Sequence, residues 1–364
     1  MPVSRLPTRG ADGTLDRHDA VRPAITVCRM TITEDAPPPT RRRRGVLLWW
    51  VLVLPGLLWA VVRLGGWERS ALVQLFAFTP YVAAWSVPLA LAALLRRRWL
   101  PGALAVVAAV GLVGAVLPRA LPDDRPAARG PQLRVMTSNM FVGSADPAQL
   151  VDLVRRYRVD VLALQEYTSD GEAALVAAGL AAELPHRQSN AEVVTTGSGL
   201  WSRHPLSDTG MRRNGGGFAQ SYGTVAVPGG PPVLVESAHP RAPATRQRLD
   251  VWRADLAAQP PATAGGPLRI LLGDFNATLD HAAMRRVLGT GYTDAADALG
   301  TGLIATWGPY DGTPIPPVTS GPATTARSSP RSPCPDGESA EPAWGQKRVQ
   351  AQPIPAGPEL GPGW

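Results

Sequence analysis

Five polar residues in the part of the chain after Leu133 follow short apolar segments, at points where a β-strand would end. They are Asn139, Glu166, His239, Asp274 and Asn276. Carboxylate and amide oxygens are ligands that suit Mg²⁺, and a carboxylate or an imidazole can move a proton. Because open sheets build sites from residues at strand ends, we expect these side chains to meet at one edge of a sheet.

Taken singly, these residues have ordinary explanations. A glutamate after a strand, such as Glu166, is usually a solvated loop residue, and the segment Asp274-Phe275-Asn276 has the composition of a turn. The repetition of such residues after four successive segments favours one functional site over four unrelated loops.

The segments before these residues have the periodicities of strands and helices in alternation. Leu133–Ser138 alternates as a strand does, and 147–157 has apolar residues at helical spacing with Asp146 as its expected N-cap. Arg246–Ala258 is predicted to be an amphipathic helix. Further strands are predicted at 161–164, 199–202, 223–227, 233–238 and 269–272. This mixture predicts a single α/β or α+β domain over residues 133–319.

The order of these motifs resembles the endonuclease/exonuclease/phosphatase superfamily, whose members include DNase I-like nucleases, sphingomyelinases and inositol-polyphosphate phosphatases. The motifs that carry the resemblance are Asn139, Leu164-Gln165-Glu166, Ser202-Arg203-His204-Pro205, His239-Pro240 and Gly273-Asp274-Phe275-Asn276. The resemblance covers about half of the chain. It implies an α+β fold in the form of a four-layer α/β/β/α sandwich with two packed sheets.

The resemblance also implies a metal site and a catalytic apparatus. Glu166 would be the principal ligand of Mg²⁺, with Mn²⁺ as an alternative, and Asn139 would lie beside the metal as a ligand and catalytic residue. Asp274 would orient or deprotonate the attacking water. Asn276 and His239 would act at the scissile phosphate, with Asn276 also binding it.

Arg203 is the remaining residue that the resemblance assigns to the site. It lies in the Ser-Arg-x-Pro segment of the family, and we expect it to bind substrate.

Three apolar runs precede this domain, at about 45–65, 71–95 and 99–118, and the only charged residue in them is Arg63 near the end of the first. Each is long enough to cross a bilayer, which needs roughly 17–25 residues of helix. The alternative is three buried core helices, but such helices normally keep a polar stripe. Tryptophans such as Trp49 and Trp99 lie toward the run ends, as membrane anchors do.

The basic residues predict the orientation of these spans. Arg41–Arg44 and Arg96–Arg98 flank the same side of a three-pass topology, whereas the loop around Trp67 is nearly neutral. Positive charge on the cytoplasmic side places residues 1–44, a predicted disordered tail, in the cytoplasm. The linker 119–132 and the domain are then extracytoplasmic, at the plasma membrane. Much of the net charge of +7 lies in the tail, so it implies no nucleic-acid-binding face.

The last part of the chain departs from the family pattern. Thr306-Trp307 matches a family motif, but the two Asp-His motifs expected after it are missing, and no histidine follows His281. Residues 320–364 are rich in proline and glycine, which predicts disorder. Codons for Ala323–Arg327 can read Asp-His-Arg in a shifted frame, so we hypothesise a deletion or sequencing error near Thr319. Sequencing of the locus tests this hypothesis.

The sequence therefore supports three hypotheses. The first is an extracytoplasmic Mg²⁺-dependent phosphoesterase anchored in the bilayer, impaired where the terminal Asp-His motifs are lost. The second is a catalytically inactive membrane protein, and the third is a module that binds a phosphate ligand without hydrolysis. The sequence does not choose among nucleic acid, phospholipid and phosphorylated metabolite as substrate, and it does not indicate an oligomeric state.

Overall fold

The structure is a computed structural model that describes residues 40–69, 72–123, 130–263, 265–306, 318–320 and 346–348. Residues Gly45–Trp364 form one compact unit. Residues 1–39 of the predicted tail at 1–44, part of the linker and most of the predicted tail at 320–364 lie outside the described residues, whereas residues 40–44 belong to a helix.

The first part of the described chain is helical. Its elements are α1 (Thr40–Leu64), α2 (Leu72–Leu75), the 3₁₀ helix η1 (Phe76–Phe78), α3 (Thr79–Leu95), α4 (Trp99–Val116) and the 3₁₀ helix η2 (Leu117–Ala120). Three stretches are long and apolar enough to cross a membrane: Gly45–Leu64, Leu72–Leu95 and Trp99–Ala120. The prediction of three candidate membrane-spanning helices is therefore confirmed.

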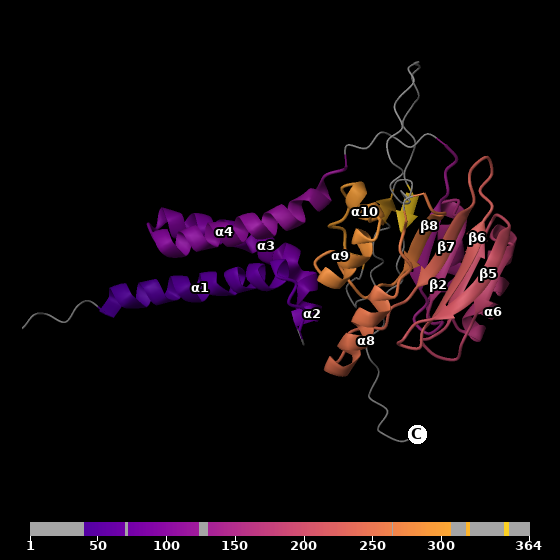
Figure 1. The fold of residues 1–364 in the computed structure, drawn as a ribbon, viewed down its shortest axis with the longest axis horizontal. Coiled ribbons are helices and arrows are strands. Elements are labelled where there is room, and N and C mark those ends of the chain that lie inside the picture. Colours follow the sequence, from indigo (N-terminus) through magenta and orange to yellow (C-terminus); the bar gives the residue numbers. More distant parts are fainter. Residues whose placement is uncertain are drawn as a thin grey trace, which may run out of the picture. The chain divides into compact units, whose positions relative to one another are not determined.

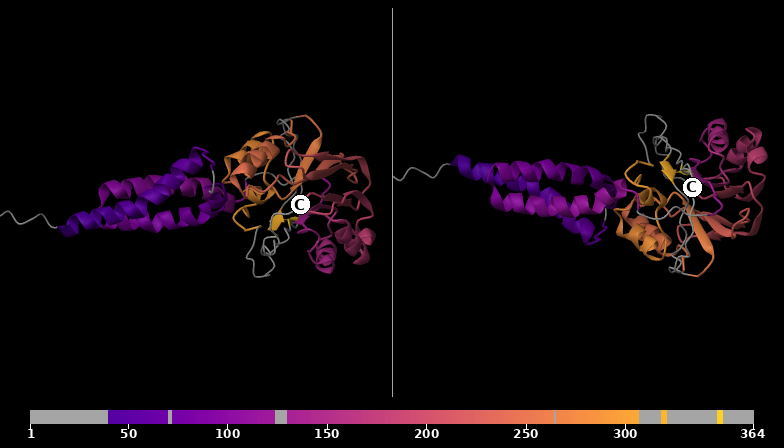
Figure 2. Two further views of the ribbon diagram at one scale, coloured as in Figure 1. Left: turned by 90° about the horizontal axis from the view of Figure 1, so that it is seen from below. Right: turned by 90° about the horizontal axis from the view of Figure 1, so that it is seen from above.

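Small residues lie between these helices and large apolar residues face outward. Ala60, Ala83 and Ala108 are buried in a shared cluster, which allows the helix backbones to approach closely. Leu58 and Trp85 are instead exposed. Figure 2 shows the indigo and purple helices running alongside one another. An outward apolar surface of this kind suits contact with lipid.

The first sheet contains four strands in the order β1-β2-β4-β3. They are β1 (Val135–Asn139), β2 (Val161–Gln165), β3 (His186–Asn190) and β4 (Ser198–Ser202). β1 and β2 are parallel, with Asn139 opposite Gln165 at their ends, and the other pairs are antiparallel.

The second sheet also contains four strands, in the order β5-β6-β7-β8. They are β5 (Leu206–Arg213), β6 (Ala219–Val225), β7 (Val233–Ala238) and β8 (Leu268–Gly273). They lie side by side in that order in Figure 1. β7 and β8 are parallel, with Ala238 opposite Gly273 at their ends. Two further short strands, β9 (Val318–Ser320) and β10 (Gln346–Arg348), pair with each other.

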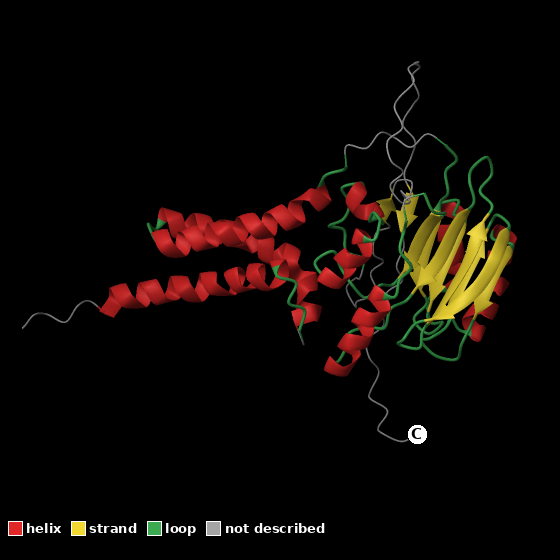
Figure 3. Ribbon diagram, viewed as in Figure 1, coloured by secondary structure: helices red, strands yellow, loops and turns green. Residues whose placement is uncertain are grey.

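Short helices accompany the two sheets (Figure 3). They are α5 (Pro147–Arg156), α6 (Ser169–Ala177), α7 (Leu180–Glu183), α8 (Arg246–Ala257), α9 (Ala282–Gly289) and α10 (Ala295–Ala298). α5 begins at the predicted N-cap, because the Asp146 carboxylate accepts hydrogen bonds from the backbone N–H groups of Ala148 and Gln149 at 2.9 and 3.2 Å.

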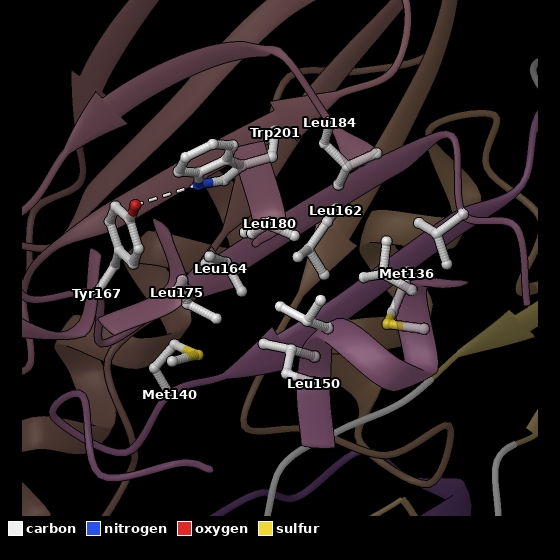
Figure 4. Packing of buried hydrophobic residues seen from close by; sticks show 13 residues of the cluster. Met136, Met140, Leu150, Leu162, Leu164, Tyr167, Leu175, Leu180, Leu184 and Trp201 are labelled. Carbon is white, nitrogen blue, oxygen red and sulfur yellow. Dashed lines mark hydrogen bonds between the residues drawn. The ribbon is translucent and has the colours of Figure 1, made fainter. Parts of the chain in front are cut away.

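Alternation along β2 shows how the layers form. Leu162 and Leu164 pack in one apolar cluster with Leu150 of α5, which Figure 4 shows from close by. Val161 and Ala163 pack in a second cluster with residues of the other sheet. A strand buried on both faces reads as a continuous apolar run, as this one does.

A third cluster lies on the outer side of the second sheet. It joins Leu249, Trp252 and Leu256 of α8 to Met284 and Val287 of α9. The order is therefore helices, sheet, sheet, helices. The predicted four-layer α+β sandwich, preceded by three candidate membrane helices, is confirmed.

Candidate active site

The ends of the two parallel strand pairs bring the predicted residues together. Asn139 ends β1 and Glu166 follows β2, so both lie at one end of the first sheet. His239 follows β7 and Asp274 follows β8, so both lie at one end of the second sheet. β1 lies against β8 and β2 against β7, which places these two ends beside each other.

Asn139 joins the two predicted carboxylates. Its Nδ2 donates hydrogen bonds to Glu166 Oε1 at 3.1 Å and to Asp274 Oδ2 at 3.2 Å. Its Oδ1 accepts from the backbone N–H of Phe141 at 2.9 Å. The N–H of Val142 donates to Glu166 Oε2 at 3.1 Å. One amide group thus fixes two acidic side chains that are more than 100 positions apart in the chain.

The backbone at this site is strained. Glu166 and Asn276 have φ values of 52° and 49°, and Phe141 and Val142 have values of 49° and 54°. Residues other than glycine adopt this left-handed conformation at a cost, and they keep it only where the surroundings hold them. Four of the seven such residues in the described ranges lie in the three loops that carry the predicted site.

Gly273 allows β7 and β8 of the second sheet to end close together. It has φ +153°, and a Cβ at this position would lie 1.8 Å from the Ala238 carbonyl oxygen. A side chain is therefore excluded directly before Asp274. This close approach holds Asp274 next to His239.

His239 is buried, with 3% of its surface exposed, and packs edge-on against Phe218 with ring centroids 4.7 Å apart. Its Nδ1 is buried and has no hydrogen-bond partner among the described residues. Burial lowers the pKa of His239 below its usual value, against the opposing influence of Asp274 and Asp255. The imidazole is therefore neutral at physiological pH.

The loop after His239 is joined to the loop after β8. Asn276 Nδ2 donates a hydrogen bond to the Pro240 carbonyl at 3.0 Å, and the backbone N–H of Asn276 donates to Asp274 Oδ1 at 3.0 Å. The structure therefore brings Asn139, Glu166, Asp274 and Asn276 into one chain of hydrogen bonds, with His239 beside it.

Electrostatic repulsion is built into this arrangement. The pKa of Glu166 is raised, first because burial removes water from the carboxylate and then because Asp274 lies near it. The hydrogen bonds from Asn139 and Val142 oppose this rise. The pKa of Glu166 is raised overall, so its surroundings disfavour the ionised carboxylate.

Arg203 does not lie with the other predicted residues. Its N–H donates to the Asp160 carbonyl at 2.8 Å and its Nη2 to the Val159 carbonyl at 3.1 Å. Both partners precede β2, whereas Glu166 follows it. Arg203 thus lies at the opposite end of the first sheet and has contacts that belong to the fold rather than to this site.

Two residues that sequence reasoning missed hold the His239 loop. Asn214 Nδ2 donates to the His239 carbonyl at 2.8 Å. Asp255 is fully buried, and its carboxylate accepts from the N–H groups of Gly216 and Arg241 at 3.0 and 3.1 Å. The available signal for Asp255 was a charged residue on the apolar face of the predicted helix 246–258.

Gln165 is a third residue that supports the candidate site, because it connects the two sheets beneath it. Its Oε1 accepts from Thr137 Oγ1 at 3.0 Å and its Nε2 donates to Ser237 Oγ at 2.9 Å. Thr137 and Gln165 belong to the first sheet and Ser237 to the second. This buried bridge fixes the distance between the sheets directly beneath the carboxylates.

The side chains present fit a hard divalent cation. No cluster of three or more His, Cys, Asp or Glu side chains suited to a metal occurs in the described part of the chain. Mg²⁺ needs fewer protein ligands than such a cluster provides, because it is commonly bound by one or two carboxylates and keeps several waters. Glu166 and Asp274 offer two carboxylates, and a cation would offset both the burial and the repulsion from Asp274 that raise the pKa of Glu166.

The sequence profile of the Endonuclease/Exonuclease/phosphatase family matches residues 136–329, more than half of the chain. The chain belongs to this family. The match begins at β1 and includes every residue of the candidate site. It ends ten positions after Thr319, where the domain was predicted to end, in a part of the chain that the structure does not describe. A comparison with curated proteins gives no match.

Three solved structures resemble the chain over less than half of its length. An endonuclease/exonuclease/phosphatase from Beutenbergia cavernae is 19% identical, with a TM-score of 0.38, over 45% of this chain and 55% of that one. Humanized D. rerio TDP2 is 16% identical (TM-score 0.35) over 43% and 66%, respectively. Staphylococcus aureus beta toxin with bound magnesium ions is 12% identical (TM-score 0.34) over 45% and 72%. The chain thus spans about half of the first of these.

Proposed function

We propose that this protein is a membrane-anchored phosphoesterase that depends on a divalent metal ion. The observation that supports this most directly is the junction of Glu166 and Asp274 through Asn139 at the meeting point of the two sheets. A pair of carboxylates that repel each other, beside a neutral buried imidazole, is an arrangement suited to a cation and a phosphate ester.

Glu166 is the proposed principal ligand of Mg²⁺ or Mn²⁺. Asn139 holds its position, and its Oδ1, which accepts one hydrogen bond from Phe141, keeps a second lone pair that could ligate the ion. When bound, the ion would polarise a phosphoryl oxygen and lower the pKa of bound water.

Asp274 is the proposed base for the attacking water. Its Oδ1 accepts from the backbone of Asn276 and its Oδ2 from Asn139, so the carboxylate is held in one orientation. An oriented carboxylate near a water is what general-base catalysis requires.

Asn276 and His239 are the proposed contacts to the phosphate. One amide hydrogen of Asn276 is used on the Pro240 carbonyl, and the other is proposed to reach a phosphate oxygen. His239 is neutral, so it carries a hydrogen on one ring nitrogen and can donate it to developing negative charge on the phosphate. Arg203 has no part in this scheme because of its place in the sheet.

The proposed orientation places the domain outside the cytoplasm. Glu68, in the loop between the first two spans, accepts from the N–H of Ala283 at 3.3 Å, so this loop and the domain share one side. Arg96–Arg98 follow α3 at the far end of that helix. With basic loops in the cytoplasm, the domain is extracytoplasmic. C-terminal fusions to alkaline phosphatase and to a fluorescent protein test this, and fluorescence without phosphatase activity would contradict it.

The activity is tested on the full-length chain in detergent. We expect hydrolysis of bis(p-nitrophenyl) phosphate with Mg²⁺ and none with EDTA. Asp274→Asn should lower kcat about 10²–10⁴-fold, the usual contribution of a positioned base. Single-stranded DNA, phospholipid vesicles and a phosphorylated metabolite then compare the three substrate classes.

The alternative hypotheses predict different results in the same assay. Binding of inorganic phosphate in the presence of Mg²⁺, without turnover of any substrate, would assign the site to a binding module. Neither binding nor turnover would identify an inactive membrane protein. The terminal Asp-His motifs are missing from the sequence, and the impaired activity expected from their loss stays a prediction; residues 307–317 and 321–345 lie outside the described ranges.

A further inference from the structure

The loop that carries Asp274 and Asn276 continues directly into a buried ion cluster. Asp280 has 1% of its surface exposed. Its Oδ1 accepts from Arg63 Nε at 2.9 Å and Arg119 Nη2 at 2.7 Å, and its Oδ2 accepts from Arg119 Nη1 at 2.8 Å. Arg63 is in the last turn of α1 and Arg119 in η2, so both arginines stand at ends of candidate membrane spans.

His281 makes a second connection to the same region. Its Nδ1 accepts from the backbone N–H of Thr278 at 2.9 Å, so Nε2 carries the hydrogen and donates to the Val73 carbonyl at 2.7 Å. The ring packs edge-on against Phe76 of η1 and against Trp252 of α8. His281 therefore fastens the start of α9 to the short helix α2.

The loop between the first two spans closes around the start of α9. The Glu68 carboxylate accepts from the N–H of Ala283 through both oxygens at 3.3 Å, which suits the positive end of a helix. A Cβ at Gly66 would lie 3.1 Å from the Ala282 side chain. Arg285 Nη1 donates to the Asp280 carbonyl at 2.6 Å.

The second site loop touches the same segment. Gln74 Nε2 donates to the Pro243 and Ala244 carbonyls at 3.3 and 3.5 Å, four and five positions after His239. Val73 is fully buried in the cluster that contains Trp252. The two site loops of the second sheet, after β7 and β8, therefore both contact the segment from Glu68 to Gln74, which runs from the loop after α1 into the start of the second candidate span.

We propose that the outer ends of the membrane helices are part of the active-site architecture, with Asp280 as the positioning residue that connects them to it. This inference rests on the proposed function for its catalytic consequence. Asn276 has a strained backbone, so the chain on both sides of it must be held. Pro240 holds its side chain, and Asp280, four positions later, holds the chain that leaves it.

The ion cluster suits this role better than apolar packing would. A buried carboxylate between two guanidinium groups accepts only one arrangement, because a shift of about an ångström would leave charges unpaired. Apolar contacts would tolerate such a shift. A misplacement of this size at an active site can lower the rate about 100-fold.

The test compares two buried carboxylates in the full-length chain in nanodiscs. Asp280→Asn removes the charge held by Arg63 and Arg119. The matched control is Glu236→Gln, because Glu236 has 2% of its surface exposed and is also held by two arginines, Arg212 at 2.5 Å and Arg269 at 3.5 Å. Among the described residues, the Glu236 side chain has hydrogen bonds and ion pairs only with Arg212, Gln220 and Arg269, none of which lies in a loop of the candidate site.

Hydrogen exchange of residues 274–281 is the first measurement, made well below the unfolding midpoint of each variant. We expect faster exchange in Asp280→Asn and unchanged exchange in Glu236→Gln, even if both lower the midpoint. Mg²⁺ affinity should fall about 10–100-fold only in Asp280→Asn, as it does when a group that orients a ligand is lost. kcat/KM should fall about 100-fold in the same variant.

Unchanged exchange of 274–281 in Asp280→Asn, or an equal rise in both variants, would show that the cluster only stabilises the fold, and would overturn the proposal. If Asp280→Asn does not fold, Arg119→Lys is the second variant. Lysine keeps the positive charge but loses the bidentate contact with Asp280, so we expect the same changes in hydrogen exchange and Mg²⁺ affinity, but smaller ones. If the wild-type chain shows neither Mg²⁺ binding nor hydrolysis, the proposed function fails. The exchange comparison still decides whether the helix ends hold this loop.

Discussion

Replacement of Glu166 by glutamine should stabilise the protein in the absence of metal while it removes metal binding. The pKa of Glu166 is raised by burial and by Asp274, so the charged carboxylate costs stability at neutral pH. Glutamine has nearly the same shape without the charge. A charged Glu166 would therefore lower the stability of the metal-free protein, as is typical of residues that serve function at a cost in stability, and this is consistent with a metal ligand.

The geometry sets the size of the effect. Asn139 Nδ2 lies 3.1 Å from Glu166 Oε1 and 3.2 Å from Asp274 Oδ2, so these oxygens are no more than about 6 Å apart. Two charges at that distance repel by about 1–3 kcal/mol at effective dielectric constants between those of water and a protein surface. Loss of one hydrogen bond to the carboxylate offsets about 1 kcal/mol. We expect a net gain of about 1 kcal/mol, or about 2–4 °C in the unfolding midpoint.

Thermal unfolding of the full-length chain in detergent, followed by tryptophan fluorescence, measures this gain in EDTA at pH 7.5. The penalty is present above the raised pKa and absent below 4.5, the ordinary pKa of a glutamate, so the gain should disappear as the pH falls toward 4.5. Mg²⁺ should raise the midpoint of the wild-type chain and leave Glu166→Gln unchanged. Glu183→Gln, at a partly exposed ion pair, is the control. A lower midpoint for Glu166→Gln than for wild type at pH 7.5 in EDTA would refute the reasoning.

Three further substitutions test the site. His239→Gln should lower kcat about 10²–10³-fold, as loss of a transition-state donor does. Because burial lowers the pKa of His239, the stability of the wild-type protein should also fall as the pH drops below 6.5. The stability of the variant should fall less over the same pH range. Gly273→Ala should prevent folding or lower the midpoint strongly, because its Cβ would lie 1.8 Å from the Ala238 oxygen; folded protein at wild-type yield would contradict this. Arg203→Ala should lower stability but change kcat/KM less than about threefold, since the residue lies at the far end of the first sheet; a loss above tenfold would restore it to the site.

The elements with strong periodicity could be predicted from sequence. β2 and β8 read as apolar strands, and α8 read as an amphipathic helix. β2 is buried throughout, β8 buries Ile270 and Leu272, and α8 buries Leu249, Trp252 and Leu256. Their ends carry Glu166 and Asp274. The carboxylates at the centre of the candidate site were therefore within reach of sequence reasoning.

Other elements carry little local signal. β3 has the sequence His-Arg-Gln-Ser-Asn and lies at a sheet edge, where no apolar alternation is needed. β5 contains a bulge around Asp208, which interrupts its alternation. Arg203 was assigned to the site by its motif, but the antiparallel direction of β4 carries it to the opposite end of the sheet from Glu166. Strand direction is a tertiary property that the motif does not contain.

Arg63 and Arg119 show a further limit of reading charge from sequence. In the proposed orientation both stand at the outer ends of spans, where free basic residues oppose the tendency of positive charge to stay in the cytoplasm. The structure pairs both with Asp280, so neither charge is free once the domain has folded. Asp280 lies more than 150 positions away from either arginine. The two arginines can therefore be understood as contacts of the loop after β8 and not as signals of topology, and the proposed orientation rests on Arg41–Arg44 and Arg96–Arg98.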